Sequence, residues 1–195
     1  MSIFVMGLDL GQAQDFTAQV ICQATGTQYD SHLVGLPLTQ CDVRHIDRYD
    51  LGTRYTDIAV DVGKRLRQVP QPRYLVIDET GVGRGVLEMF SGLGAHGITI
   101  TGTGQATLTA PMHVHVPKRD LVSTAQVALQ NGVLKIGRNL KHADTLVKEL
   151  LPFRTKIVSF RQACMTRQGL VATVVERARR PWQRWHSRQQ RFLKI

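Results

Sequence analysis

Two aspartates stand at the ends of two apolar segments that lie far apart in the chain. Asp9 ends the segment VMGLD and Asp78 ends the segment LVID, and a glycine follows each within three residues. An ionised carboxylate at the end of a buried strand is costly unless it is paired, hydrogen-bonded or bound to a cation. On neighbouring strands the two acids would point into one site, and Mg²⁺ and Mn²⁺ prefer such oxygen ligands. The alternative is that each aspartate only caps its following turn.

The elements that must position these acids begin with strands. Short apolar segments that end near glycine or proline predict strands over 3–10, 16–22 and 28–38, the last as an edge strand. Their short connections predict an antiparallel meander. Helices then alternate with strands, which predicts a mixed sheet with helices on its faces. Helices are predicted over 55–69, 118–130 and 140–151, and a further short helix is predicted to end at Phe90. The strands between them are predicted over 73–78, 98–101 and 133–137. Residues 102–111 are predicted to form a loop.

The positive charge of the chain is concentrated at its C-terminal end. The formal net charge is +10, yet residues 1–153 hold 14 basic and 14 acidic residues. Residues 154–195 hold 11 Lys and Arg residues and one acid, Glu176. Such a block indicates either a polyanionic partner or a solvated extension. Three scattered cysteines and no apolar run of about 18 residues favour a soluble protein of the reducing cytosol, without a membrane.

Several segments resemble, in order, the nuclease domain of phage terminase large subunits, a ribonuclease H-like family. They are GLDLGQAQDFTA from Gly7, VIDETGVG from Val76, VPKRDLV from Val116, NGVLKI from Asn131 and LVKELLPFR from Leu146. The resemblance covers roughly residues 3–157. It implies a ribonuclease H-like domain over residues 1–157, in which an antiparallel meander precedes parallel strands flanked by helices, and a basic C-terminal helix or tail over residues 158–195.

The resemblance also implies a metal-dependent endonuclease that acts in phage DNA packaging. By carry-over, Asp9 and Asp78 are the catalytic acids and hold one or two Mg²⁺ or Mn²⁺ ions. Asp15 is a weaker candidate ligand in the loop after the first strand. Glu79 is another, although successive strand residues face opposite ways.

The cations that the resemblance assigns to double-stranded DNA are spread along the chain. Their role would be to contact backbone phosphates, and the alternative for each is an ordinary surface cation. They are Arg84, Lys118 and Arg119, and the basic C-terminal block adds Arg179 and Arg180 as candidate DNA contacts.

The sequence departs from the family where a third acid is expected. Gln168 and Gly169 occupy the positions before Leu170-Val171, and neither supplies an anionic oxygen. Three explanations remain open for the tail. It is a decayed or frame-shifted ending that leaves an inactive relic, or a basic arm whose Trp182 and Trp185 stack on nucleic acid, or another acid enters from elsewhere.

These observations leave two main functional hypotheses. The first is a terminase-type endonuclease in the bacterial host cytosol, monomeric in isolation and working with a separate packaging ATPase and portal, since the sequence has no GxxxxGK[ST] phosphate loop. The second is a catalytically inactive DNA-binding or packaging-accessory module. A nucleotide binder of the sugar-kinase or actin type, whose DLG opening is similar, would need a second, duplicated domain.

Overall fold

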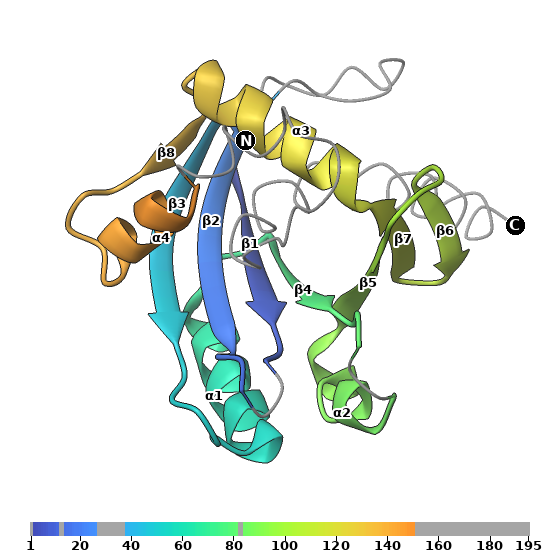
Figure 1. The fold of residues 1–195 in the computed structure, drawn as a ribbon. Helices are drawn as coiled ribbons and strands as arrows, with labels where there is room; N and C mark the ends of the chain where they lie inside the picture. Colours follow the sequence, from blue (N-terminus) through green and yellow to red (C-terminus); the bar gives the residue numbers. More distant parts are fainter. Residues whose placement is uncertain (1, 12–13, 27–37, 82–83, 151–195) are drawn as a thin grey trace, which may run out of the picture.

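The computed structural model describes residues 2–11, 14–26, 38–81 and 84–150. Eight strands form one sheet in the order β6-β7-β5-β4-β1-β2-β3-β8 (Figure 1). The strands are β1 (Ser2–Asp9), β2 (Ala18–Gly26), β3 (Leu38–Arg48), β4 (Arg73–Asp78), β5 (Ala95–Thr101), β6 (Thr107–Ala110), β7 (His113–Pro117) and β8 (Leu134–Ile136). The helices are α1 (Tyr55–Gln68), α2 (Arg84–Glu88), the single 3₁₀ turn η1 (Ser91–Leu93), α3 (Lys118–Gln130) and α4 (Ala143–Leu150).

The strand directions give the mixed sheet that the sequence predicts. β1, β2 and β3 form an antiparallel meander. β4 pairs parallel to β1, followed by β5 and β7 in the same direction, while β8 pairs parallel to β3. An antiparallel meander whose first strand is extended by parallel strands is the ribonuclease H-like arrangement, so the predicted fold class is confirmed.

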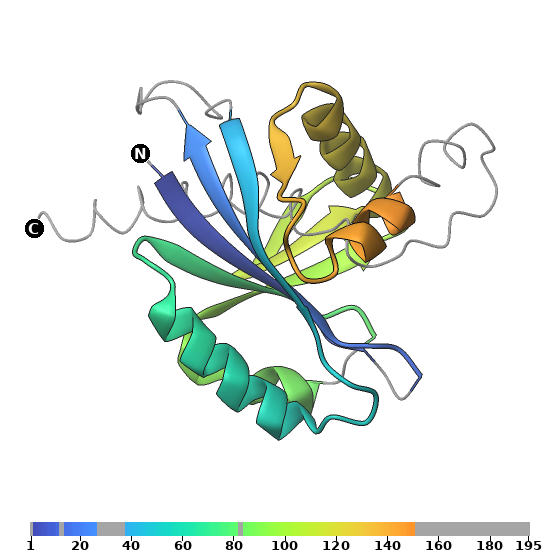
Figure 2. The same ribbon diagram turned by 90° about the vertical axis from the view of Figure 1, so that its left-hand side faces the viewer.

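Helices cover both faces of this sheet (Figure 2). α1 buries Ile58, Val62 and Leu66, spaced one helical turn apart, against β1 and β4. α2 packs beside it on the same face, and the side chain of Phe90 just beyond α2 is fully buried there. On the opposite face, α3 packs Leu121 against the centre of the sheet, while α4 packs against β2 and β3.

Two predicted segments differ from the structure. The strand that pairs with β2 runs over Leu38–Arg48, whereas the third strand was predicted over 28–38, of which residues 28–37 lie outside the described residues. β3 was missed because charged residues interrupt its apolar pattern and a bulge opposite Ile21 and Cys22 shifts it. The predicted loop 102–111 contains β6, a strand whose four residues are all exposed and show no hydrophobic pattern.

Candidate metal and nucleic-acid site

Asp9 and Asp78 occupy directly paired positions on neighbouring strands. β1 and β4 run parallel, and their register places Asp9 opposite Asp78 as the last residue of each strand. Paired residues on adjacent strands are about 4.8 Å apart and project to the same face. The structure therefore confirms that the two acids lie side by side at neighbouring strand ends; their catalytic and metal-binding roles stay predictions.

Because side chains alternate between the two faces of a strand, Asp9 and Asp78 both lie on the face of the sheet that α3 covers. Val5 and Val76, each an even number of residues before Asp9 or Asp78, belong to the core cluster that Leu121 of α3 completes. Both aspartates are largely buried, with 8% and 9% of their surface exposed. Two acidic side chains thus share one partly enclosed position at the carboxyl end of the parallel strands.

One of the two acids also has the turn-capping role that the sequence allowed. The backbone N–H of Thr80 donates a hydrogen bond to Asp78 Oδ1 at 2.8 Å. A carboxylate has two oxygens and about four lone-pair directions, so this hydrogen bond orients Asp78 and is compatible with cation binding. Gly11, close to the end of β1, is held by two similar contacts. Its N–H donates to the Thr17 hydroxyl at 3.0 Å, and the Tyr55 hydroxyl donates to its carbonyl at 2.7 Å.

The two weaker candidate ligands do not join this pair in the same way. Glu79 points to the opposite face of the sheet, where its Oε1 accepts a hydrogen bond from the Thr99 hydroxyl (2.9 Å) and its Oε2 lies 3.1 Å from His113 Nδ1. A side chain at Gly97 would overlap Glu79 and His113, so this glycine makes room for their contact. Asp15 is exposed in the loop between β1 and β2.

The predicted DNA-contacting cations are described only in part. Lys118 begins α3 directly after β7 and is half-buried. Arg119 is exposed, donates a hydrogen bond to the Gly104 carbonyl at 3.1 Å and lies 3.6 Å from Asp120. Arg84 begins α2, on the face opposite the aspartate pair, and its side chain lies outside the description. Arg179 and Arg180 lie outside the described residues, as do Gln168, Gly169 and the tail domain predicted over 158–195.

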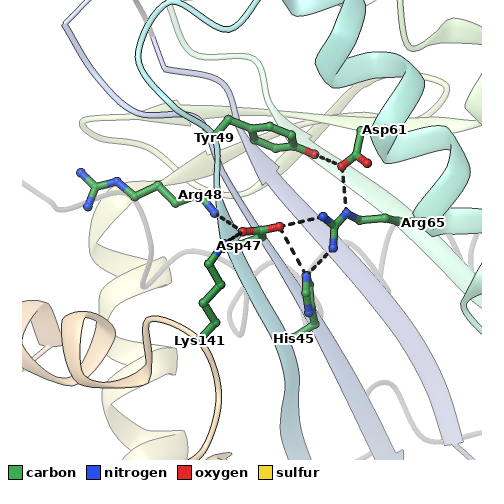
Figure 3. Close-up of polar contacts among 7 residues, drawn as sticks. All are labelled: His45, Asp47, Arg48, Tyr49, Asp61, Arg65 and Lys141. Carbon is green, nitrogen blue, oxygen red and sulfur yellow. Dashed lines mark hydrogen bonds and ion pairs between the residues drawn. The ribbon is translucent and has the colours of Figure 1, made fainter.

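A polar network at the end of β3 went unnoticed in the sequence (Figure 3). Asp47 accepts hydrogen bonds from Arg65 Nη2 and Lys141 Nζ, at 2.7 and 2.8 Å. Arg65 also donates to Asp61 at 2.8 Å, and the Tyr49 hydroxyl donates to Asp61 at 2.7 Å. These residues come from the end of β3 and the residue after it, from α1 and from the segment before α4, so only the fold brings them together.

The network shifts the pKa values of its members. Burial alone would raise the pKa of Asp47, but hydrogen bonds from Lys141 and from the Arg48 N–H, with the charge of Arg65, lower it. Burial opposes a lowering of the pKa of Asp61 in the same way, and hydrogen bonds from Arg65 and Tyr49 prevail. Both acids are therefore held ionised by groups of the protein itself.

Arg48 is the second feature that sequence reasoning missed. It is the register partner of Ala18, which is in turn the partner of Asp9, so the three lie in one row across the sheet and on the same face. Its guanidinium carbon lies 3.5 Å from the centre of the Phe16 ring. The signal in the sequence was an arginine ending a segment of alternating polar and apolar residues, which is too common to single it out.

The described residues contain no group of three or more His, Cys, Asp or Glu side chains that could hold a metal ion. A cation at the aspartate pair would therefore have two carboxylate ligands from the described residues. No helix in the described part of the chain is long and apolar enough to cross a membrane.

Comparison of the sequence with protein-family models and with curated proteins finds no match. Among solved structures, the chain is similar to RuvC from Thermus thermophilus, with 12% sequence identity and a TM-score of 0.41 over 90% of this chain and 95% of that chain. A similarity of this degree supports no conclusion about function. The assignment of the fold rests on the strand order and directions described above.

Proposed function

We propose that this protein is a metal-dependent nuclease that hydrolyses phosphodiester bonds in double-stranded DNA. The observation that carries the proposal is the register of β1 and β4, which places the buried carboxylates of Asp9 and Asp78 at paired strand ends. Two like charges on neighbouring strands repel each other, and a divalent cation between them removes that repulsion. The pair therefore has the composition of a cation site.

The donor set fits one Mg²⁺ or Mn²⁺ ion. Mg²⁺ is commonly bound by one or two carboxylates, with water and substrate phosphate oxygens completing its coordination. Asp9 and Asp78 would supply the carboxylates, and the Thr80 N–H keeps the Asp78 side chain oriented. When bound, the ion would lower the pKa of a coordinated water and stabilise negative charge on the phosphate. A second ion would need ligands beyond the described residues, which contain no third acid at this position.

The finer part of the proposal is that the reaction belongs to phage DNA packaging. Its support is the ordered resemblance of residues 3–157 to terminase nuclease domains, together with the basic C-terminal block. We propose double-stranded DNA as the substrate, with a separate packaging ATPase and portal as partners in the bacterial host cytosol.

A catalytically inactive DNA-binding module is the second candidate. It is favoured by one observation, which is that only two acids meet at the site among the described residues. Such a protein would keep the fold and the basic block and would bind DNA without cutting it.

Plasmid cleavage separates the two candidates. Supercoiled plasmid is incubated with the full chain and Mn²⁺ or Mg²⁺, and nicking is followed on agarose gels. We expect wild-type protein to nick the plasmid and Asp9→Asn and Asp78→Asn to lose at least about a hundredfold in rate, because each removes half of the ion's protein ligands.

The matched control is Asp57→Asn, which removes an exposed acid from the first turn of α1 on the opposite face. It is expected to nick at the wild-type rate. Equal nicking by wild type, Asp9→Asn and Asp78→Asn would refute the aspartate site. DNA binding by the wild type without any nicking would instead establish the inactive module.

A further inference from the structure

We propose that Arg48, stacked on Phe16, binds a DNA phosphate neighbouring the one held at Asp9 and Asp78. This inference rests on the proposed function, because it names a further contact of the same substrate. Neither the resemblance to terminases nor the basic block points to this residue.

The sheet register places the cation Arg48 in the same row of residues as the two acids. Asp78, Asp9, Ala18 and Arg48 are consecutive partners across β4, β1, β2 and β3, and register partners share a face of the sheet. Arg48 is therefore two strand spacings, about 10 Å, from Asp9. A DNA strand whose scissile phosphate lies at the acid pair carries further phosphates on either side, and Arg48 faces the side of β2 and β3. The small side chain of Ala18 lies between them.

The stacking on Phe16 gives Arg48 a suitable geometry for phosphate. Its guanidinium carbon lies 3.5 Å from the centre of the Phe16 ring. Stacking of a guanidinium on an aromatic ring leaves its N–H groups directed outward along the edge, where they match a phosphate. Arg48 is half-buried, and its Nε is buried with no hydrogen-bond partner among the residues that the structure describes. A buried donor of this kind gains free energy when an acceptor arrives.

The polar network on the opposite face fixes the backbone that carries Arg48. Its two neighbours in the chain, Asp47 and Tyr49, are tied to Arg65 and Asp61 of α1, and Asp47 also accepts the Arg48 N–H at 3.0 Å. In Figure 3 the Arg48 side chain extends away from these contacts. The network thus holds β3 from one face while Arg48 faces the other, so the cation is presented on a rigid strand and not on a loop.

The test is the salt dependence of DNA binding by the full chain. A fluorescein-labelled 20-base-pair duplex is titrated in EDTA, and the dissociation constant is measured by fluorescence anisotropy between 50 and 200 mM NaCl. We expect Arg48→Ala to weaken binding about three- to tenfold and to reduce the slope of log K against log [NaCl] by about 0.9, the contribution of one phosphate contact. A purely structural role would not change the number of released counterions.

The matched control is Arg44→Ala. Arg44 is an exposed arginine on the same strand, and it donates to Gln23 at 2.7 and 2.9 Å, away from the acid pair. It is expected to keep the wild-type slope and affinity. Arg48→Lys should keep the slope with weaker binding, because lysine retains the charge and loses the planar stack. Phe16→Leu should do the same, and both variants remain informative if Arg48→Ala fails to fold.

The outcomes separate this inference from the proposed function. An unchanged salt slope in Arg48→Ala, or an equal loss in Arg44→Ala, would overturn the role of Arg48 even if Asp9 and Asp78 prove essential for nicking. The expected loss of slope would support Arg48 as a phosphate contact even if the wild-type protein does not nick DNA. Absence of duplex binding by the wild type would refute the role of Arg48 and the inactive DNA-binding module, and the nicking assay would still decide the nuclease.

Discussion

Acidic residues on the two faces of this sheet lie next to different charged groups. On the α1 face, Asp47 and Asp61 are surrounded by cations of the chain itself, namely Arg65 and Lys141. On the α3 face, the register of β1 and β4 sets two carboxylates, Asp9 and Asp78, at adjacent positions. The first arrangement balances its charge by contacts between elements. The second brings like charges together.

This difference separates a stabilising group of acids from a candidate binding site. Arg65 bonds residues of β3 and α1 at once, so the network joins two elements and holds the end of β3. Adjacent like charges cost free energy in the folded state, and the cation that we propose would reduce that cost. The three predictions that follow test this contrast.

The largest expected effect concerns the stability of the network. Arg65→Ala should lower the free energy of unfolding by about 2 kcal/mol, since it removes hydrogen bonds to two charged groups, with some discount for their partial exposure. Asp78→Asn should lower it by less than about 1 kcal/mol, because it relieves repulsion and its amide oxygen can still accept from Thr80. Urea denaturation at pH 7 measures both.

Arg67→Ala, which removes an exposed arginine from the same helix, is the control for loss of positive charge at the end of α1. We expect it to change stability by only a few tenths of a kcal/mol. If Asp78→Asn costs as much as Arg65→Ala, the aspartate pair is a structural element and the contrast fails.

The second prediction concerns stabilisation by the metal. Mn²⁺ at five times its dissociation constant should stabilise the wild-type protein by about 1 kcal/mol, and a thermal melt should show this as a rise in Tm of roughly 2–4 °C. Asp9→Asn and Asp78→Asn should show no rise in Tm with Mn²⁺. Asp47→Asn should show the same rise as the wild type, starting from a lower Tm. An equal rise in Asp9→Asn would place the ion elsewhere.

The smallest effect is the pH dependence of the network. Burial lowers the pKa of His45, as does the charge of Arg65, against the opposing effect of Asp47 and Asp61; Lys141 lowers it further. The unfolded chain therefore takes up this proton first as the pH falls. Neutral His45 makes its full contribution to the free energy of unfolding above its pKa in the unfolded chain, about 6.5. This contribution decreases as the pH falls from there towards the lower pKa of His45 in the folded protein.

Urea midpoints at pH 7.5 and 5.5 measure this dependence. His45→Gln should reduce the loss of stability between the two values. Part of this pH-dependent loss of stability should remain, because burial also lowers the pKa of His96, as does the charge of His113. The carboxylates Asp47 and Asp61 stay ionised across this range, since their pKa values are lowered, and their contribution is lost only at more acidic pH. An unchanged loss in His45→Gln would exclude His45 as its source.

Local patterns were sufficient for most elements. The strand over 73–78 and the helix over 118–130 match β4 and α3, because their apolar residues and flanking turns are continuous in the sequence. β3 and β6 were not predicted correctly, and β7 was not predicted as a strand. β3 carries the polar side chains of the network on one face and a bulge, and β6 is an exposed edge strand held by pairing with β7. Both depend on neighbours that are distant in the sequence.

The sequence by itself determined that two buried strands end in aspartates, that the elements follow a meander and then an alternation, and that the positive charge gathers after residue 153. Tertiary structure alone decided the register that pairs Asp9 with Asp78, the opposite direction of Glu79 and the stacking of Arg48 on Phe16. Periodicity reports which residues are buried, because burial depends on local side-chain alternation. The alignment of one strand with another depends on packing over the whole sheet, which no local pattern records.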